Sequence, residues 1–193
     1  MRKPALHRVL LIIGLFTITS RHLTAGIQAE AEAVIQSVFN KEHHIIQFDP
    51  LALSPAERHQ AETKTGQRFI LDQIYLWIIY DSTALAGIAV LDNVRGKAQP
   101  ITYLVVYTPD LVVKQVHIIK YREQIGGAVQ NQRWLGQFSG YRDQANETLS
   151  LGGAIDGITG ATISADAITR GVARMTAYLN ALNFNEIIHR AEK

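Results

Sequence analysis

The chain has no cysteine among its 193 residues. Disulfides, cysteine-ligated zinc, iron–sulfur clusters and c-type haem attachment are therefore excluded, as is the acylated cysteine of a lipoprotein. The sequence also lacks a P-loop, a GxGxxG dinucleotide fingerprint and a Ser-His-Asp motif. It has no basic stripe and no nucleic-acid recognition motif, so we expect no nucleic-acid partner.

A long hydrophobic run is missing as well, although the N-terminus carries a short one. Arg2, Lys3 and Arg8 precede the apolar run Val9 to Ile18, which falls short of the ~20 residues of a membrane-spanning helix. A basic start followed by a short apolar segment is typical of a signal peptide. We predict that residues 1–26 are a signal peptide or an N-terminal membrane anchor, with a buried first helix as the alternative. The protein is then expected to be periplasmic or otherwise extracytoplasmic.

Two kinds of pattern divide the rest of the chain. Helical spacing predicts a helical N-terminal segment over residues 27–65, with one helix at Gln28–Asn40, a break at Phe48-Asp49-Pro50 and a second helix from Ser54. From Gly66 onward, runs of β-branched and aromatic residues predict strands. These runs are Arg68–Leu71, Ile74–Tyr80, Ala84–Leu91, Ile101–Tyr107 and Leu111–Lys120.

The order of these patterns predicts the fold class. Thr108-Pro109-Asp110 is a turn signal, so the strands on either side of it are expected to pair antiparallel. A loop with a helical turn near 131–135 and a long helix from Ser164 to about Leu182 follow. We predict an α+β fold, a predominantly antiparallel twisted sheet packed with helices, for a domain over residues 66–183. Residues 184–193 are expected to form a helical extension.

Possible metal ligands gather at one place in the sequence, Glu42, His43 and His44. Adjacent side chains point in different directions along a helix or a strand, so the three residues make a poor chelate. We therefore predict no metal site.

The most informative segment is Asp156-Gly157-Ile158-Thr159-Gly160-Ala161-Thr162, a turn of small residues directly before a predicted helix. The first turn of a helix has backbone N–H groups without intrahelical acceptors and the positive end of the helix dipole, so it suits a phosphate. Gly160 and Ala161 leave room for a ligand near the backbone. Thr162 adds a hydroxyl at the place where that phosphate would lie. An ordinary capped turn before an amphipathic helix is the alternative interpretation of the same residues.

The complete motif resembles the flavinylation signature of the FMN-binding domain family. That family includes the flavin-carrying subunits of the Rnf and sodium-pumping NADH:quinone oxidoreductase complexes. In those proteins a flavin transferase esterifies FMN, through its phosphate, to the last threonine of the motif, which is Thr162 here. The resemblance extends from about Gly66 to about Tyr178. Its further segments are Lys97–Val106, Val116–Gly126 and Trp134–Gly140.

The resemblance implies a flavin site made by the motif and one loop. Besides covalent FMN on Thr162, it implies cofactor contacts from Asp156, Ile158, Thr159, Gly160, Ala161 and Ser164. It implies a second wall formed by Glu123, Gly126 and Gly127, with the Glu123 carboxylate near the flavin. Tyr121 and Trp134 are the aromatic candidates for contact with the isoalloxazine. The loop has the family's glycines but lacks the proline that many members carry.

The function implied by this resemblance is electron transfer. We expect an exported flavoprotein that carries FMN on Thr162 and passes electrons between membrane or periplasmic redox partners. A flavin transferase would be its maturation partner, and a membrane electron-transfer complex is one setting in which it would work. The alternatives are a domain that binds FMN non-covalently and a flavin-dependent sensor or assembly domain.

Overall fold

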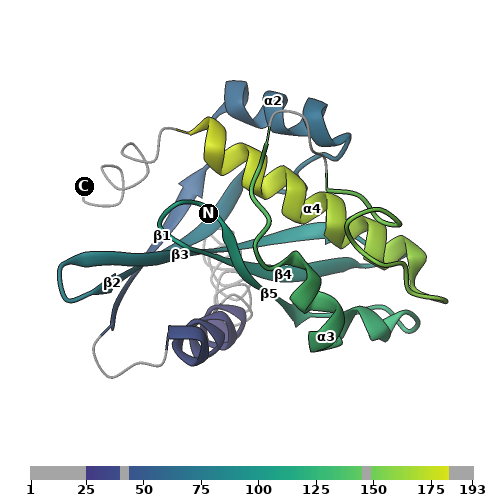
Figure 1. Cartoon of the computed structure of the whole chain (residues 1–193), viewed down its shortest axis with the longest axis horizontal. Coiled ribbons are helices and arrows are strands. Elements are labelled where there is room, and N and C mark those ends of the chain that lie inside the picture. Colours follow the sequence, from purple (N-terminus) through teal and green to yellow (C-terminus); the bar gives the residue numbers. More distant parts are fainter. Residues whose placement is uncertain (1–24, 40–43, 145–148, 183–193) are drawn as a thin grey trace, which may run out of the picture.

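The computed structural model describes residues 25–39, 44–144 and 149–182 (Figure 1). Five strands form one sheet in the order β1-β2-β3-β4-β5, and every neighbouring pair is antiparallel. The predicted α+β fold and antiparallel sheet are therefore confirmed. The strands are β1 His44–Ala52, β2 Gln73–Asp81, β3 Ala84–Arg95, β4 Pro100–Tyr107 and β5 Val113–Lys120.

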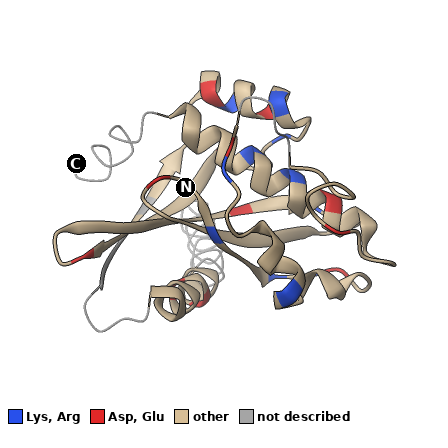
Figure 2. Ribbon diagram, in the orientation of Figure 1, with Lys and Arg blue, Asp and Glu red and all other residues tan. Residues whose placement is uncertain are grey.

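Helices cover both faces of this sheet (Figure 1). Helices α2 (Pro55–Thr65) and α4 (Thr162–Ala181) lie over one face, where Ile168 and Val172 of α4 belong to the larger core cluster. A helix over residues 25–39 covers the other face and buries Ile35 in a second cluster around Trp77. Because both faces are buried, strand interiors are apolar on both sides and carry few charges (Figure 2).

The two helices predicted within residues 27–65 form, but the segment between them is the strand β1 and not a break. It pairs antiparallel with β2 along its whole length and contains Phe48-Asp49-Pro50, which the sequence had suggested as a break. β1 is the edge of the sheet, and an edge strand tolerates proline because one side of it needs no ladder hydrogen bond. The proline was therefore a misleading signal.

The segment Arg68–Leu71 is a second correction, because it forms a loop before β2 and not a strand. One apolar side chain of this loop packs into the core and does not belong to a strand. Phe69 is buried, and its ring meets that of Tyr178 edge-on at a centroid distance of 5.5 Å. The backbone N–H of Phe69 is satisfied by Glu62 Oε1 at 2.9 Å, so the loop needs no sheet partner there.

The segment after β5 has short helical elements, as the sequence predicted near 131–135. They are η1 Gly127–Gln130, α3 Gln132–Leu135 and η2 Gly136–Phe138. The long helix begins at Thr162, two residues before the predicted start. Most of the predicted targeting segment, the 184–193 extension, and Glu42 and His43 lie outside the described residues. Among the described residues, no helix is long and apolar enough to cross a membrane.

A buried ion pair joins α4 to β3. The Arg174 guanidinium contacts Asp92 Oδ2 and the Arg68 carbonyl oxygen, and both charged side chains are almost completely buried. The Tyr103 hydroxyl donates to the same carboxylate oxygen at 3.2 Å. Burial raises the pKa of Tyr103 well above its usual value of 10.0, so this hydroxyl remains a donor. The network fixes the helix whose first residue is Thr162.

Candidate functional site

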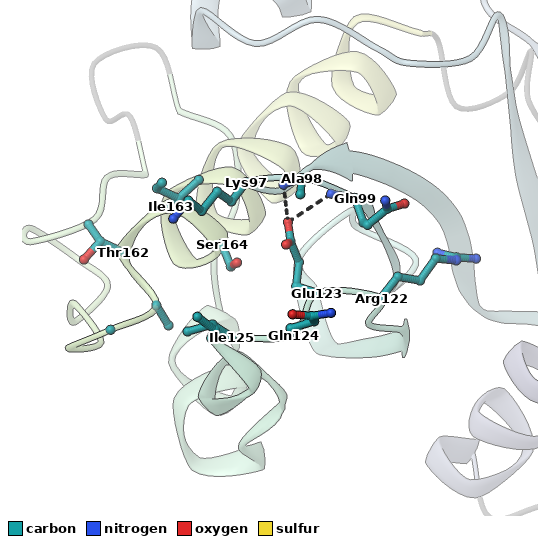
Figure 3. Close-up of a pocket in the computed structure, with 13 residues that line it drawn as sticks. Lys97, Ala98, Gln99, Arg122, Glu123, Gln124, Ile125, Thr162, Ile163 and Ser164 are labelled. Carbon is teal, nitrogen blue, oxygen red and sulfur yellow. Dashed lines mark hydrogen bonds between the residues drawn. The ribbon is translucent and has the colours of Figure 1, made fainter.

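A cavity of about 790 Å³ lies at the N-terminal end of α4 (Figure 3). Three segments line it: Lys97–Gln99 in the β3–β4 turn, Arg122–Gly126 after β5, and Gly160–Ser164 at the start of α4. Pockets for small molecules and cofactors are typically ~300–1,000 Å³, so this cavity has room for one. The segments lie far apart in the sequence and meet only in the folded chain.

The α4 wall brings a hydroxyl and unpaired backbone donors to the cavity. Thr162 is the first residue of the helix and is exposed, whereas Ser164 is buried. The N-cap residue Ala161 supplies no side-chain hydrogen bond, and its own N–H donates to the Ile158 carbonyl at 3.0 Å. First-turn N–H groups have no intrahelical acceptors, so they are available to an anion.

Tyr121 connects the loop after β5 to the first turn of α4. Its hydroxyl donates to the Ile125 carbonyl at 2.6 Å and lies 3.1 Å from Ser164 Oγ. Gly126 adopts φ 90°, and a Cβ at this position would lie 2.6 Å from the Tyr121 hydroxyl oxygen. A glycine is therefore required here, both for its backbone conformation and for this close approach. The two walls are held in a fixed relation by these contacts.

The Glu123 side chain points to the wall formed by the β3–β4 turn. Its Oε1 accepts hydrogen bonds from the backbone N–H of Ala98 at 2.8 Å and of Gln99 at 3.1 Å (Figure 3). These two hydrogen bonds hold the pKa of Glu123 below its usual value, so the carboxylate is ionised at neutral pH. The carboxylate thus binds the backbone of the β3–β4 turn.

Trp134 supports the motif from behind and is not among the residues that line the cavity. Its indole Nε1 donates to the Asp156 carbonyl at 2.8 Å, and Gln137 Oε1 accepts from the Asp156 N–H at 2.9 Å. The ring is only 6% exposed and packs edge-on against Phe138. Trp134 therefore holds the backbone of the motif in place, and its predicted contact with the isoalloxazine remains a prediction.

The other residues that the sequence singled out fall into two groups. Those that line the cavity are Glu123, Gly126, Gly160, Ala161, Thr162 and Ser164. Those outside the lining are Tyr121, Gly127, Trp134, Asp156, Ile158 and Thr159. Gly127 is the first residue of η1, and Ile158 packs against the hydrophobic core. Both residues therefore contribute to the fold around the cavity and do not line it.

Sequence reasoning named no site residue on the wall formed by the β3–β4 turn. Lys97, Ala98 and Gln99 stand in a turn between two strands, and nothing local marks them as ligand contacts. The same holds for the further lining residues Arg122, Gln124, Ile125 and Ile163. Two signals were nevertheless available: Lys97 opens a segment that resembles the family, and Ile125 and Ile163 are large apolar residues beside predicted site residues.

The comparisons with known proteins agree with this geometry. Residues 96–177 match the family model of the FMN-binding domain, a range that includes all three walls of the cavity. This match assigns residues 96–177 to an FMN-binding domain. It is similar in structure to NqrC of Shewanella oneidensis, with a TM-score of 0.54 and 16% sequence identity, over 80% of this chain and 88% of that chain. At this identity the likeness concerns the fold. No curated protein matches the chain significantly.

The residues at the cavity fit FMN. The first turn of α4 offers N–H donors to a phosphate, and Lys97 supplies positive charge on the facing wall. Ile125 is 74% exposed and Ile163 is 53% exposed, one on each of two walls. Exposed apolar side chains beside a cavity suit a flat aromatic ring such as isoalloxazine.

Proposed function

We propose that this protein is an extracytoplasmic electron carrier whose FMN is attached to Thr162 by a phosphoester. The observation that carries the proposal is the exposed Thr162 hydroxyl at the first residue of α4, in the lining of a cavity of about 790 Å³. The complete Asp156-to-Thr162 motif supports the covalent form. In the ester, the FMN phosphoryl group replaces the hydroxyl proton of Thr162, so the chain gains the mass of FMN less one water.

The chain's own residues would bind and orient the cofactor. The N–H groups at the start of α4 would donate to the phosphate, and the positive end of the helix dipole would favour its charge. Ile125 and Ile163 offer apolar contacts to the ring from two walls. Bound FMN supplies one- and two-electron chemistry, whereas the protein sets its orientation and surroundings.

Mass spectrometry after coexpression with a flavin transferase tests the attachment. We expect one FMN less one water on the intact chain, and flavin fluorescence that stays with the band in a denaturing gel. An unmodified chain, with a transferase that is active on a known substrate, would contradict the covalent carrier and favour the non-covalent alternative. Redox titration with candidate electron donors then separates a carrier from a sensor, because a carrier must be reduced and reoxidised by protein partners.

Reporter fusions test the proposed location. The basic residues Arg2, Lys3 and Arg8 before an apolar run motivate the expectation that the domain is exported. A reporter that works only outside the cytoplasm, fused after Lys193, should be active. A matched fusion that lacks residues 1–26 should lose this activity. Activity only from a cytoplasmic reporter would contradict the location and weaken the carrier proposal.

A further inference from the structure

Two consecutive side chains after β5 hold the β3–β4 turn in place. Glu123 Oε1 accepts from the N–H groups of Ala98 and Gln99. On the other side, Arg122 Nη1 donates to the Pro100 carbonyl at 3.2 Å and to Thr102 Oγ1 at 3.0 Å. We call this set of contacts the turn clamp. It ties the loop after β5 to a hairpin that lies 20 to 25 residues earlier in the sequence.

The turn inside this clamp is tightly closed. The Gly96 N–H donates to the Gln99 carbonyl at 3.1 Å. A Cβ at Gly96 would collide with Glu123 Oε1 and would lie 2.8 Å from the Gln99 carbonyl oxygen. Glycine is therefore required at position 96 for the close approach of the Glu123 carboxylate. The hydrogen bonds from Ala98 and Gln99 to this carboxylate restrict the backbone of the turn.

The clamp places Lys97 on the wall of the cavity. In Figure 3 the Lys97 side chain extends from the turn toward Ile163 and the Thr162 end of α4. Within the described part of the chain, its ammonium forms no hydrogen bond and no ion pair. The neighbouring Glu123 carboxylate is instead directed at two backbone N–H groups. Among the described residues, the Lys97 ammonium thus interacts with Glu123 only at longer range and remains available to a ligand in the cavity.

We propose that Lys97 binds the phosphate of FMN and that Glu123 is a positioning residue, which acts on the cofactor by holding the turn that carries Lys97. The proposal rests on the cavity being the FMN site. An ammonium on a flexible four-carbon stem can follow the phosphate, and charge-assisted hydrogen bonds to phosphate are stronger than neutral ones. The phosphate then has backbone N–H groups on one side and a side-chain cation on the other.

Binding of FMN and riboflavin to the full chain, produced without a transferase, tests the contact. Riboflavin has the same ring and lacks the phosphate. We expect Lys97→Gln to weaken FMN binding ~10-fold or more and to leave riboflavin binding unchanged. Lys97→Arg should retain most of the FMN affinity. Arg95→Gln is the matched control. Arg95 lies two residues before Lys97, is exposed and is not among the residues that line the cavity, so this variant removes one positive charge without changing the lining.

A double-mutant cycle tests the positioning role of Glu123. Glu123→Ala should weaken FMN binding, whereas Lys97→Gln/Glu123→Ala should bind no more weakly than Lys97→Gln alone. Glu123→Gln keeps an oxygen acceptor for the turn and should retain most of the affinity. It should also leave the flavin midpoint potential nearly unchanged, whereas a carboxylate that acted directly on the ring would raise the potential when neutralised.

Several results would overturn this proposal. They are a wild-type chain with no preference for FMN over riboflavin, equal losses of affinity for both ligands in Lys97→Gln, and additive losses of FMN affinity in the double variant.

Failure of the proposal for Lys97 is distinguishable from failure of the covalent carrier. Lys97-dependent FMN binding without transfer to Thr162 would contradict only the carrier, and an FMN-loaded Thr162 with unchanged binding in Lys97→Gln would contradict only the role of Lys97.

Discussion

Thr162→Ala should abolish covalent FMN attachment and leave the fold intact. The substitution removes the only hydroxyl that the motif places on the first residue of α4, so no phosphoester can form there. Thr162 is exposed and alanine is a good helix former, so we expect a change in the free energy of unfolding within about 0.5 kcal/mol. Intact mass and in-gel flavin fluorescence after coexpression with a transferase measure the attachment.

Two further variants make this result specific. Thr162→Ser keeps a hydroxyl, so residual attachment would show how strictly the transferase reads the methyl group. Ser139→Ala removes an exposed hydroxyl outside the cavity lining and should be loaded like the wild type. Persistent FMN on Thr162→Ala would show that the attachment point lies elsewhere, and the proposal for Thr162 would then be wrong.

Arg174→Met should destabilise the protein by about 3–5 kcal/mol, because it leaves the Asp92 carboxylate buried without its cation. The loss includes the contact of the guanidinium with the Phe69 ring, which it overlies at 4.1 Å from the ring centroid. Urea denaturation gives the free energy of unfolding. Arg170→Met is the matched control, because its i,i+4 pair with Asp166 is exposed and should contribute at most ~0.5 kcal/mol.

Replacing both members of the pair should recover much of this loss. Asp92 Oδ1 and Arg174 Nε are buried without a hydrogen-bond partner in the described part of the chain, so the pair is not fully satisfied. An apolar pair of similar volume, Asp92→Leu with Arg174→Met, removes both charges from the interior. If Arg174→Met alone cost no more than Arg170→Met, the network would not be what fixes α4 to the sheet.

The local patterns in the sequence determined the motif and the elements around it. Asp156-to-Thr162 was recognisable because its residues are contiguous, and the apolar stripe after it predicted α4 from helical spacing alone. Thr108-Pro109-Asp110 likewise predicted the antiparallel pairing of β4 and β5, because turn chemistry is local. These features depend on neighbours within a few residues, which the sequence displays directly.

Tertiary structure alone decided the features that depend on distant contacts. β1 is a strand because its backbone pairs with β2, which overrides the signal of Pro50. Trp134 lies behind the motif because its indole N–H meets the Asp156 carbonyl, 22 residues along the chain. Lys97 reaches the cavity because Glu123, 25 residues away from Ala98, holds the turn. Each of these outcomes follows from hydrogen bonds between segments that are distant in the sequence. The packing of the sheet brings these segments together, and no local sequence pattern specifies which segments meet.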